Sequence, residues 1–260
     1  MEDRSQGPRI GDAFGLQLSD AVRLGRPVTA FVERSDGLIA PSGSAQWLDD
    51  EQKWPPAVRD ALAGVRGPVL DVGAGGGRHG GHLARRSLHV TALDTSELAL
   101  RICRDAGVTE TVCGDVTETE RLLRGRSPFR TVLLLGNNVG LLGSVARGTD
   151  ILRQMYAVTS DDAVIVAEGR RPVAGTPENR AYAERNLAEG RLPGELVMRL
   201  RYGITATEWF PYLFCGPEDL ESIAASAGWK LGGVRDFRYP EAPSGAPLLS
   251  YTAVLSKNGG

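Results

Sequence analysis

The ten residues from Val69 to Arg78 constrain the fold and chemistry of this chain more than any other segment. Residues 69–72 are mostly apolar and predict a short buried strand, and the glycines after it let the backbone approach a ligand without a Cβ in the way. From His79 the pattern predicts a helix, whose N-terminus presents free N–H groups and partial positive charge. Strand, glycine turn and helix in this order indicate a site for the anionic part of a nucleotide-like cofactor.

Asp71 is the unusual residue in this segment, because it places a carboxylate at the end of the strand, ahead of the first glycine. That position would repel a pyrophosphate, whereas it suits a cofactor that carries positive charge. Gly75, Gly77 and Gly80 also fit the fingerprint of dinucleotide-binding proteins, so an NAD-dependent oxidoreductase is an alternative. A dinucleotide site has no use for Asp71, and we therefore favour a positively charged cofactor.

The composition indicates an ordinary globular protein with a sizeable core. The 260 residues are 42% hydrophobic and 24% charged, with a formal net charge of -2. This near-neutral charge argues against a nucleic-acid partner. The three cysteines are widely spaced and match no metal-ligand pattern, so we expect a reducing compartment and no metal. The N-terminus is polar and no segment approaches the length of a membrane span, which predicts a cytoplasmic protein without a membrane partner.

Strands and helices alternate from about residue 57 onwards. The expected strands cover residues 68–72, 89–93, 109–113, 130–135 and 163–167, and the expected helices 56–63, 80–87, 96–105, 117–124 and 149–159. This alternation predicts an α/β fold with a doubly wound, mostly parallel sheet. Right-handed crossovers bring the carboxyl ends of the strands to one edge, where ligands bind.

We divide the chain into four segments. Residues 1–56 form an N-terminal helical cap or lid with a helix over 13–24, and residues 57–170 form the cofactor-binding core. Residues 171–215 form a β-rich substrate-side insert, with a helix over 178–188 and strands over 195–202 and 204–214. Residues 216–260 complete the core sheet with a helix over 218–227 and strands over 229–237 and 248–255.

Polar residues follow the next strands of the core. Asp94 ends the second strand, about twenty residues after the first glycine, where a carboxylate accepts hydrogen bonds from a ribose diol. Asp115 follows the third strand and can accept from an adenine amine. Asn137 and Asn138 follow the fourth strand and line the middle of the crevice. The alternatives are a helix cap for Asp94, a turn residue for Asp115, and satisfaction of loop backbone for the two asparagines.

These segments resemble the class I S-adenosylmethionine-dependent methyltransferases. The resemblance lies in residues 69–77, 90–94 and 114–116 and in the strand ending at Leu135, and extends to the helix and strands after residue 216. It implies a seven-stranded Rossmann-like sheet whose last strand inserts antiparallel between the two before it. Residues 77–79 and 136–143 also resemble a subgroup with members in natural-product and modified-peptide pathways.

The resemblance assigns cofactor-binding roles by position. The glycine loop would hold the methionine portion, the end of the second strand the ribose and the end of the third strand the adenine, while the loop after the fourth strand would lie near the cofactor with Asn137 facing the acceptor. The residues so assigned are Asp71, Gly73, Ala74, Gly75, Gly77, Asp94, Thr95, Asp115, Val116, Leu135, Gly136 and Asn137.

The acceptor side is less defined. Methyl transfer is an in-line displacement at a sulfonium carbon with a neutral leaving group, so positioning and desolvation supply most of the effect. No His–Asp pair is evident, which favours an amine over a hydroxyl or carboxyl acceptor. We expect Asn137, Glu168 and Tyr212 to orient the acceptor. Trp209, Phe210 and Tyr212 are either the packing face of a strand or a substrate wall.

The predicted function is S-adenosylmethionine-dependent methyl transfer to a small-molecule or peptide acceptor of specialised metabolism, by a monomer or homodimer. One alternative is the NAD-dependent oxidoreductase. The other is a protein that binds the cofactor without catalysis.

Overall fold

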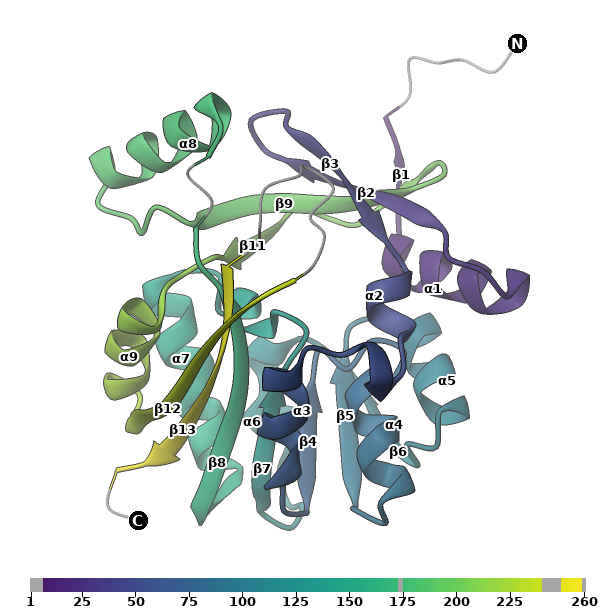
Figure 1. Cartoon of the computed structure of the whole chain (residues 1–260), viewed down its shortest axis with the longest axis vertical. Helices are drawn as coiled ribbons and strands as arrows, with labels where there is room; N and C mark the ends of the chain where they lie inside the picture. Colours follow the sequence, from purple (N-terminus) through teal and green to yellow (C-terminus); the bar gives the residue numbers. More distant parts are fainter. Residues whose placement is uncertain (1–6, 173–174, 240–248, 259–260) are drawn as a thin grey trace.

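A seven-stranded sheet forms the centre of the molecule in the computed structural model, which describes residues 7–172, 175–239 and 249–258. Its strand order is β12-β13-β8-β7-β4-β5-β6 (Figure 1). The strands are β4 (Val69–Val72), β5 (Val90–Asp94), β6 (Glu110–Cys113), β7 (Phe129–Leu134), β8 (Thr159–Arg170), β12 (Trp229–Arg238) and β13 (Leu249–Lys257). Strands β4 to β8 are parallel, and β13 lies antiparallel between β8 and β12. The predicted fold class and the inserted last strand are confirmed.

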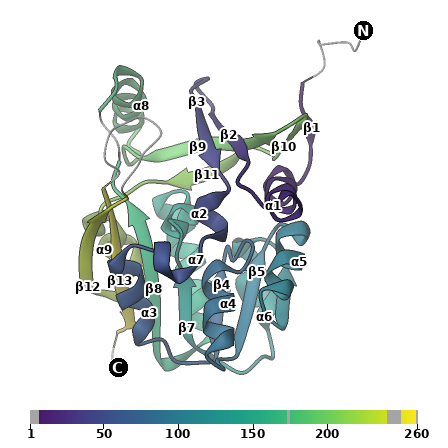
Figure 2. The ribbon, with the colours of Figure 1, turned by 45° about the vertical axis from the view of Figure 1, so that its right-hand side comes forward.

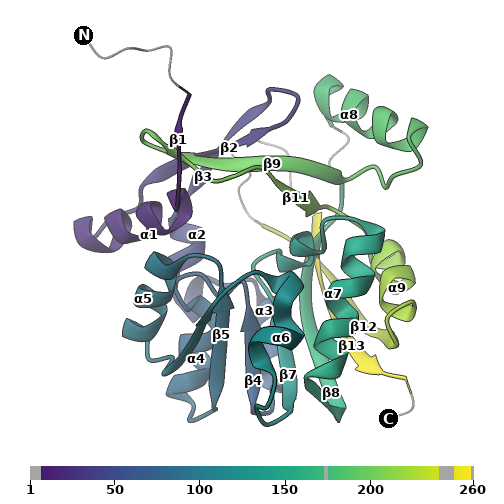
Figure 3. The ribbon, with the colours of Figure 1, turned by 180° about the vertical axis from the view of Figure 1, so that it is seen from behind.

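Helices cover both faces of this sheet, as a doubly wound fold requires (Figures 1 and 3). Strand residues alternate between the two faces: Val132 and Leu134 pack in one core cluster, and Leu133 in the other. The helices on the first face are α6 (Thr119–Leu123), α7 (Val145–Ala157) and α9 (Pro217–Ala225), and those on the second are α3 (Pro56–Ala63), α4 (Arg78–Arg85) and α5 (Glu97–Asp105).

Local signals define several helix ends. Asp12 precedes α1 (Ala13–Leu24) and its carboxylate accepts a hydrogen bond from the Gly15 amide, while Gly25 ends the helix in the left-handed conformation. Ser96 caps α5 in the same way, and Pro56 occupies the first position of α3. The short 3-10 helices are η1 (Glu51–Lys53), η2 (Val116–Glu118) and η3 (Asn138–Leu142).

A second, six-stranded sheet lies above the carboxyl ends of the parallel strands (Figures 1 and 2). It joins three strands of the N-terminal segment to three strands of the insert: β1 (Arg9–Ile10), β2 (Thr29–Arg34), β3 (Ile39–Gly43), β9 (Glu195–Tyr202), β10 (Thr205–Ala206) and β11 (Phe210–Leu213). Strand β9 pairs with β2, β10 and β11. The cap contains the expected helix α1, but the sequence did not indicate α2 (Ala45–Leu48) or the three strands.

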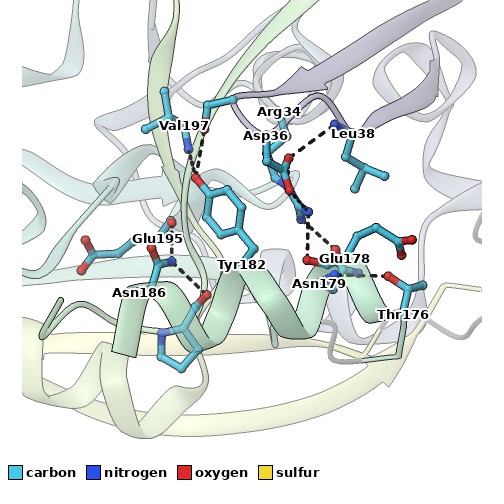
Figure 4. A network of polar contacts seen from close by, with 12 residues as sticks. Arg34, Asp36, Leu38, Thr176, Glu178, Asn179, Tyr182, Asn186, Glu195 and Val197 are labelled. Atoms are coloured by element: carbon cyan, nitrogen blue, oxygen red, sulfur yellow. Dashed lines mark hydrogen bonds and ion pairs between the residues drawn. The ribbon is translucent and has the colours of Figure 1, made fainter. Parts of the chain in front are cut away.

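Helix α8 (Pro177–Ala188) docks on this second sheet through polar contacts (Figure 4). The Arg34 guanidinium pairs with Asp36 at 2.7 Å and donates to Asn179 Oδ1 at 2.7 Å. The Tyr182 hydroxyl accepts from the Val197 amide at 3.3 Å. Cap, insert and α8 are therefore connected by hydrogen bonds and strand pairing as well as by sequence.

Most predicted elements agree with the structure to within a few residues. The strand predicted over 204–214 is instead divided into β10 and β11, because residues 207–209 leave the sheet between them. The first residue of the last predicted strand, residue 248, lies outside the described residues. No helix in the described ranges is long and apolar enough to cross a bilayer.

Candidate active site

The glycine loop after β4 has the backbone geometry that its sequence indicated. Gly73, Gly75 and Gly77 have φ values of 66°, 53° and 80°, in the left-handed region that favours glycine. A Cβ at Gly73 would lie 2.6 Å from Asn138 Nδ2. That amide donates to the carbonyls of Val72 and Gly73, at 2.8 and 2.9 Å. Asn138 therefore fixes loop backbone, which was one of the two interpretations offered for it.

Asp71 lies beneath the glycine loop. Its side chain accepts a hydrogen bond from the Gly80 amide in the first turn of α4, at 3.0 Å, and the residue is 2% exposed. Burial raises the pKa of Asp71 to about 7. Asp71 thus connects β4 to α4 from within the core, and a direct contact with a cofactor stays a prediction.

Asp94 connects two segments at the edge of the sheet. One carboxylate oxygen accepts from the Gly75 amide and the other from the Ser96 amide, both at 2.8 Å. Burial raises the pKa of Asp94, and Asp12 makes a smaller contribution in the same direction. Hydrogen bonds from the two amides lower the pKa, but the rise prevails. Asp94 therefore holds the glycine loop against the start of α5. A carboxylate has about four lone-pair sites, so this role leaves capacity for a ribose hydroxyl.

Asp115 caps η2, in agreement with the turn interpretation. Its Oδ1 accepts from the amide and the hydroxyl of Thr117, at 2.8 and 2.6 Å, and lies 3.6 Å from a guanidinium nitrogen of Arg147. Burial opposes ionisation, but these contacts prevail and lower the pKa of Asp115. All three contacts use Oδ1, which leaves Oδ2 available to a ligand.

Three other residues predicted to bind the cofactor differ in exposure. Val116, which follows Asp115, and Leu135, which follows β7, are buried, whereas Thr95 is exposed.

Asn137 and Tyr212 form the first half of an acceptor-side cluster. Asn137 is 5% exposed and has a φ of 66°, a left-handed conformation that asparagine tolerates better than most residues. The Tyr212 hydroxyl donates to the Asn137 carbonyl at 2.7 Å and accepts from Asn137 Nδ2 at 3.2 Å. The Tyr212 ring packs on Gly140, where a side chain would clash. Asn137 Oδ1 is buried and has no hydrogen-bond donor among the described residues.

Glu168 and Tyr239 form the second half of the cluster. Glu168 is 1% exposed, and its oxygens accept from the Gly136 amide at 2.9 Å and from the Tyr239 hydroxyl at 2.7 Å. Gly136 precedes Asn137, so the three predicted acceptor residues are brought together by one turn. Tyr239 was not predicted, because the sequence gives no sign that the end of β12 meets β8.

The N-terminal cap reaches the same crevice. A Cβ at Gly75 would lie 3.4 Å from Phe14, and one at Gly136 would lie 3.6 Å from Trp47. The rings of Phe14 and Trp47 meet edge to face, with centroids 6.2 Å apart. Asp12 accepts from the Ser96 hydroxyl at 2.7 Å. Phe14 and Trp47 therefore border both the glycine loop and the loop after β7, and neither was predicted as a site residue.

Residues 69–162 match a family model described as a methyltransferase domain. The matched region contains the glycine loop, Asp94, Asp115 and the turn at Asn137, which are the features assembled at the carboxyl edge of the sheet. Residues 69–162 are therefore similar to a methyltransferase domain. The NAD-dependent alternative receives no support from the comparisons.

Solved structures share this fold over 78% to 95% of the chain. A methyltransferase from Bacteroides fragilis in complex with S-adenosylhomocysteine has a TM-score of 0.73 at 23% identity, covering 95% of this chain and 94% of its own. A second, from Methanosarcina mazei, has a TM-score of 0.60 at 15% identity and covers 79% and 98%. A protein of echinomycin biosynthesis, described as converting a disulfide bond into a thioacetal group, has a TM-score of 0.52 at 19% identity and covers 78% and 82%. No curated protein matches the chain.

Each of the three histidines contacts a residue outside the acceptor-side cluster. His79 is buried with its ring 4.8 Å from that of Trp54, and burial lowers the pKa of His79 well below its usual value, so the ring is neutral. His82 lies 3.3 Å from Glu51, and His89 lies 3.0 Å from Glu110.

The aromatic residues of the insert have different surroundings. Tyr212 belongs to the acceptor-side cluster. Trp209 is 41% exposed, and the Arg199 guanidinium lies over its ring, 4.5 Å from the ring centre. This contact agrees with the interpretation of Trp209 as part of the packing face of a strand. Phe210 meets Tyr212 edge to face, with ring centroids 6.2 Å apart. Of these three residues, Tyr212 is hydrogen-bonded to Asn137.

Proposed function

We propose that the methyltransferase binds S-adenosylmethionine along the glycine loop and transfers its methyl group to an amine nitrogen held by the cluster of Asn137, Glu168, Tyr212 and Tyr239. The cofactor half and the acceptor half of this crevice meet at the turn of residues 135–137. This turn follows β7, in the middle of the sheet. The assignment of cofactor residues is the one implied by the family resemblance.

The residues present fit the cofactor. The left-handed glycines leave the loop without side chains where the methionine portion would lie, and Phe14 adds an apolar surface above it. Asp94 and Asp115 each retain acceptor capacity after their backbone contacts. S-adenosylmethionine supplies an electrophilic methyl group on a sulfonium. The chain's task is to hold the acceptor in line with it.

The buried Oδ1 of Asn137 is the observation that most directly supports an acceptor with a hydrogen-bond donor, such as an amine, over a carboxylate. A buried carbonyl oxygen without a donor costs roughly 1–3 kcal/mol, so it is expected to find a donor when substrate binds. An amine N–H can donate to this oxygen while its lone pair faces the methyl group. A carboxylate acceptor has no donor and would leave the oxygen unpaired.

The chemistry of the cluster agrees with positioning rather than with a strong base. Burial raises the pKa of Tyr212 to about 12, so the phenol stays protonated and acts as a donor and acceptor of hydrogen bonds. Glu168 is the buried carboxylate of the cluster and already accepts two hydrogen bonds. An amine that binds as its neutral form needs orientation and removal of water, and orientation alone is worth on the order of 7–11 kcal/mol.

A small molecule of specialised metabolism is the acceptor class that we favour. The similarity to a protein of echinomycin biosynthesis supports this class. The second sheet lies over the carboxyl edge and contributes Tyr212 from β11, so the acceptor would bind between two sheets rather than on an open face.

Transfer of a labelled methyl group tests the proposal. The protein is incubated with S-[methyl-³H]adenosylmethionine and matched sets of aromatic and aliphatic amines, alcohols and carboxylic acids, and products are identified by mass spectrometry. We expect label on nitrogen, and at least a tenfold loss of kcat/KM in Tyr212→Phe with unchanged binding of S-adenosylhomocysteine.

Two results would contradict the proposal. Methylation of alcohols or acids in preference to amines would remove the argument from Asn137. If S-adenosylhomocysteine binds but no methyl group is transferred to any of the amines, alcohols or acids, the alternative hypothesis of a cofactor-binding protein without catalysis is favoured. The exposed Trp209→Phe serves as the matched aromatic control, and we expect it to retain wild-type transfer.

A further inference from the structure

Two arginines near the acceptor-side cluster, Arg78 and Arg170, have no oxygen atom as a hydrogen-bond or ion-pair partner in the described residues. The other buried or half-buried arginines each have one. Arg78 and Arg170 are half-buried, and the Nε atom of each is buried without a hydrogen-bond acceptor in the described residues. Their contacts there are with aromatic rings: the Arg78 guanidinium lies 5.2 Å from the centre of the Trp54 ring, and that of Arg170 lies 5.6 Å from the centre of the Phe214 ring.

The contrast with the rest of the described chain is clear. Every other arginine there that is not exposed contacts a carboxylate or a carbonyl oxygen. These residues are Arg34 with Asp36, Arg59 with backbone carbonyls, Arg130 with Asp162, Arg147 with Asp115, Arg171 with Glu218, and Arg199 and Arg201 with Glu33.

Arg170 adjoins the cluster through β8, and the charge of Arg78 influences Tyr239 of the cluster. Arg170 follows Glu168 by two positions on β8, so the two side chains leave the same face of the strand. Phe214, beneath Arg170, meets Tyr212 edge to face with ring centroids 5.8 Å apart. Arg78 begins α4 directly after the glycine loop. Burial and Glu168 raise the pKa of Tyr239. The positive charges of Arg78 and Arg170 lower it, so both charges influence the Tyr239 hydroxyl.

We propose that the acceptor carries a carboxylate, which Arg170 and Arg78 bind at the side of the cluster opposite to the reacting nitrogen. Arginine presents a planar fork of donors that matches a carboxylate, and the aromatic rings beneath hold each fork in place while leaving its N–H groups free. Among the described residues Glu168 forms no ion pair with either arginine, and its oxygens accept from the Gly136 amide and the Tyr239 hydroxyl. The inference rests on the proposed function and narrows it to amines that also bear a carboxylate.

A pair of probes tests the charge requirement without knowledge of the acceptor. Benzoate and benzamide have nearly the same shape and differ in charge. Each is titrated into the protein saturated with S-adenosylhomocysteine, and into the free protein, and binding is followed by ligand-observed NMR. We expect benzoate to bind at least about fivefold more tightly than benzamide, since charge-assisted hydrogen bonds are roughly twice as strong as neutral ones.

Substitutions then assign the effect. Arg170→Gln and Arg78→Gln should each weaken benzoate binding at least about fivefold and leave benzamide unchanged, since each removes one charged fork. Arg101→Gln, at an exposed position of α5, is the matched control and should behave as wild type. The dissociation constant of S-adenosylhomocysteine should stay within about twofold in all three variants, a difference of about 0.4 kcal/mol.

Each other outcome overturns the inference. Equal binding of benzoate and benzamide, or benzoate binding that neither substitution changes, would show that no anion site exists here. A loss of S-adenosylhomocysteine affinity in Arg78→Gln larger than its loss of benzoate affinity would assign Arg78 to the cofactor. If S-adenosylhomocysteine does not bind the wild-type protein, the proposed function fails, and benzoate titration of the free protein still decides the anion site.

Discussion

Single carboxylates at the strand ends join segments of backbone that the chain brings together from different places. Asp94 bridges the glycine loop and the start of α5, and Asp71 bridges β4 and α4. Each was predicted as a ligand-binding residue from its position after a strand. Their backbone contacts explain how the loop keeps its shape, and Asp94 has capacity left for a ligand.

The buried carboxyl of Asp71 predicts a specific pH dependence of stability. Its pKa is raised from 3.8 to about 7, so the folded chain holds this proton more tightly than the unfolded chain does. Asp71 therefore makes its full contribution to the free energy of unfolding below about pH 4. This contribution falls by about 1.4 kcal/mol for each pH unit between about 4 and 7 and is lost as the pH rises through about 7. Asp71→Asn keeps an oxygen for the Gly80 amide and does not titrate.

Urea unfolding of wild type and Asp71→Asn at several pH values checks this expectation. Between pH 5 and pH 7 the free energy of unfolding of wild type should fall by about 2 kcal/mol relative to the variant. Parallel curves for the two proteins over this range would show that Asp71 is ionised in the fold.

At the scale of elements, the turn between β4 and α4 and the turn after β7 depend on each other. Gly73 has no side chain, and Asn138 fills the space and hydrogen-bonds the carbonyls of residues 72 and 73. Gly73→Ala should therefore displace Asn138 and move both turns. Because both turns border the proposed cofactor position, we expect at least a tenfold loss of affinity for S-adenosylhomocysteine, or about 1.4 kcal/mol.

Gly25→Ala is the matched control for this substitution. Gly25 has a φ of 61°, and a Cβ at this position would have nothing within 4 Å, so the substitution brings the same backbone strain, about 1–2 kcal/mol, without the clash. Calorimetric titration should show normal S-adenosylhomocysteine binding in Gly25→Ala. Equal affinity in the two variants would mean that the turns are not coupled.

Element boundaries were predictable from the sequence where the signal is local. The helix at 13–24 has its cap at Asp12 and its stop at Gly25, and the helix at 56–63 begins with proline. Strand β2 was missed because its partner β9 lies far along the chain, and β3, which pairs with β2, was missed because residues 41–43 combine proline, serine and glycine. The contributions of Trp47 and Tyr239 depend on this long-range packing, so no local pattern indicated them.

At the scale of the whole molecule, the N-terminal segment and the insert form one unit above the crevice. Strand β2 pairs with β9, and Glu33 on β2 accepts from Arg199 on β9 at 2.9 Å and lies 3.3 Å from Arg201. We expect the six-stranded sheet to open as a unit, because its two halves contribute neighbouring strands. Glu33→Gln weakens the ion pairs between the halves.

Hydrogen exchange with mass spectrometry measures this coupling. In Glu33→Gln, amide exchange should become faster in β2 and β9 together and stay unchanged in β4 and β7. Glu97→Gln, which removes an exposed ion pair with Arg104, is the control and should leave both sheets unchanged. Faster exchange confined to β2 would show that cap and insert move independently.

Binding of S-adenosylhomocysteine to wild type and Asp94→Ala, followed by isothermal titration calorimetry, tests the location of the cofactor site most directly. Wild type should bind with micromolar affinity and should not bind NAD. Asp94→Ala should lose at least tenfold in affinity, about 1.4 kcal/mol, while Asp150→Ala, an exposed acid on α7, should bind as wild type. Wild-type affinity in Asp94→Ala would contradict the site assigned to the carboxyl edge of the sheet.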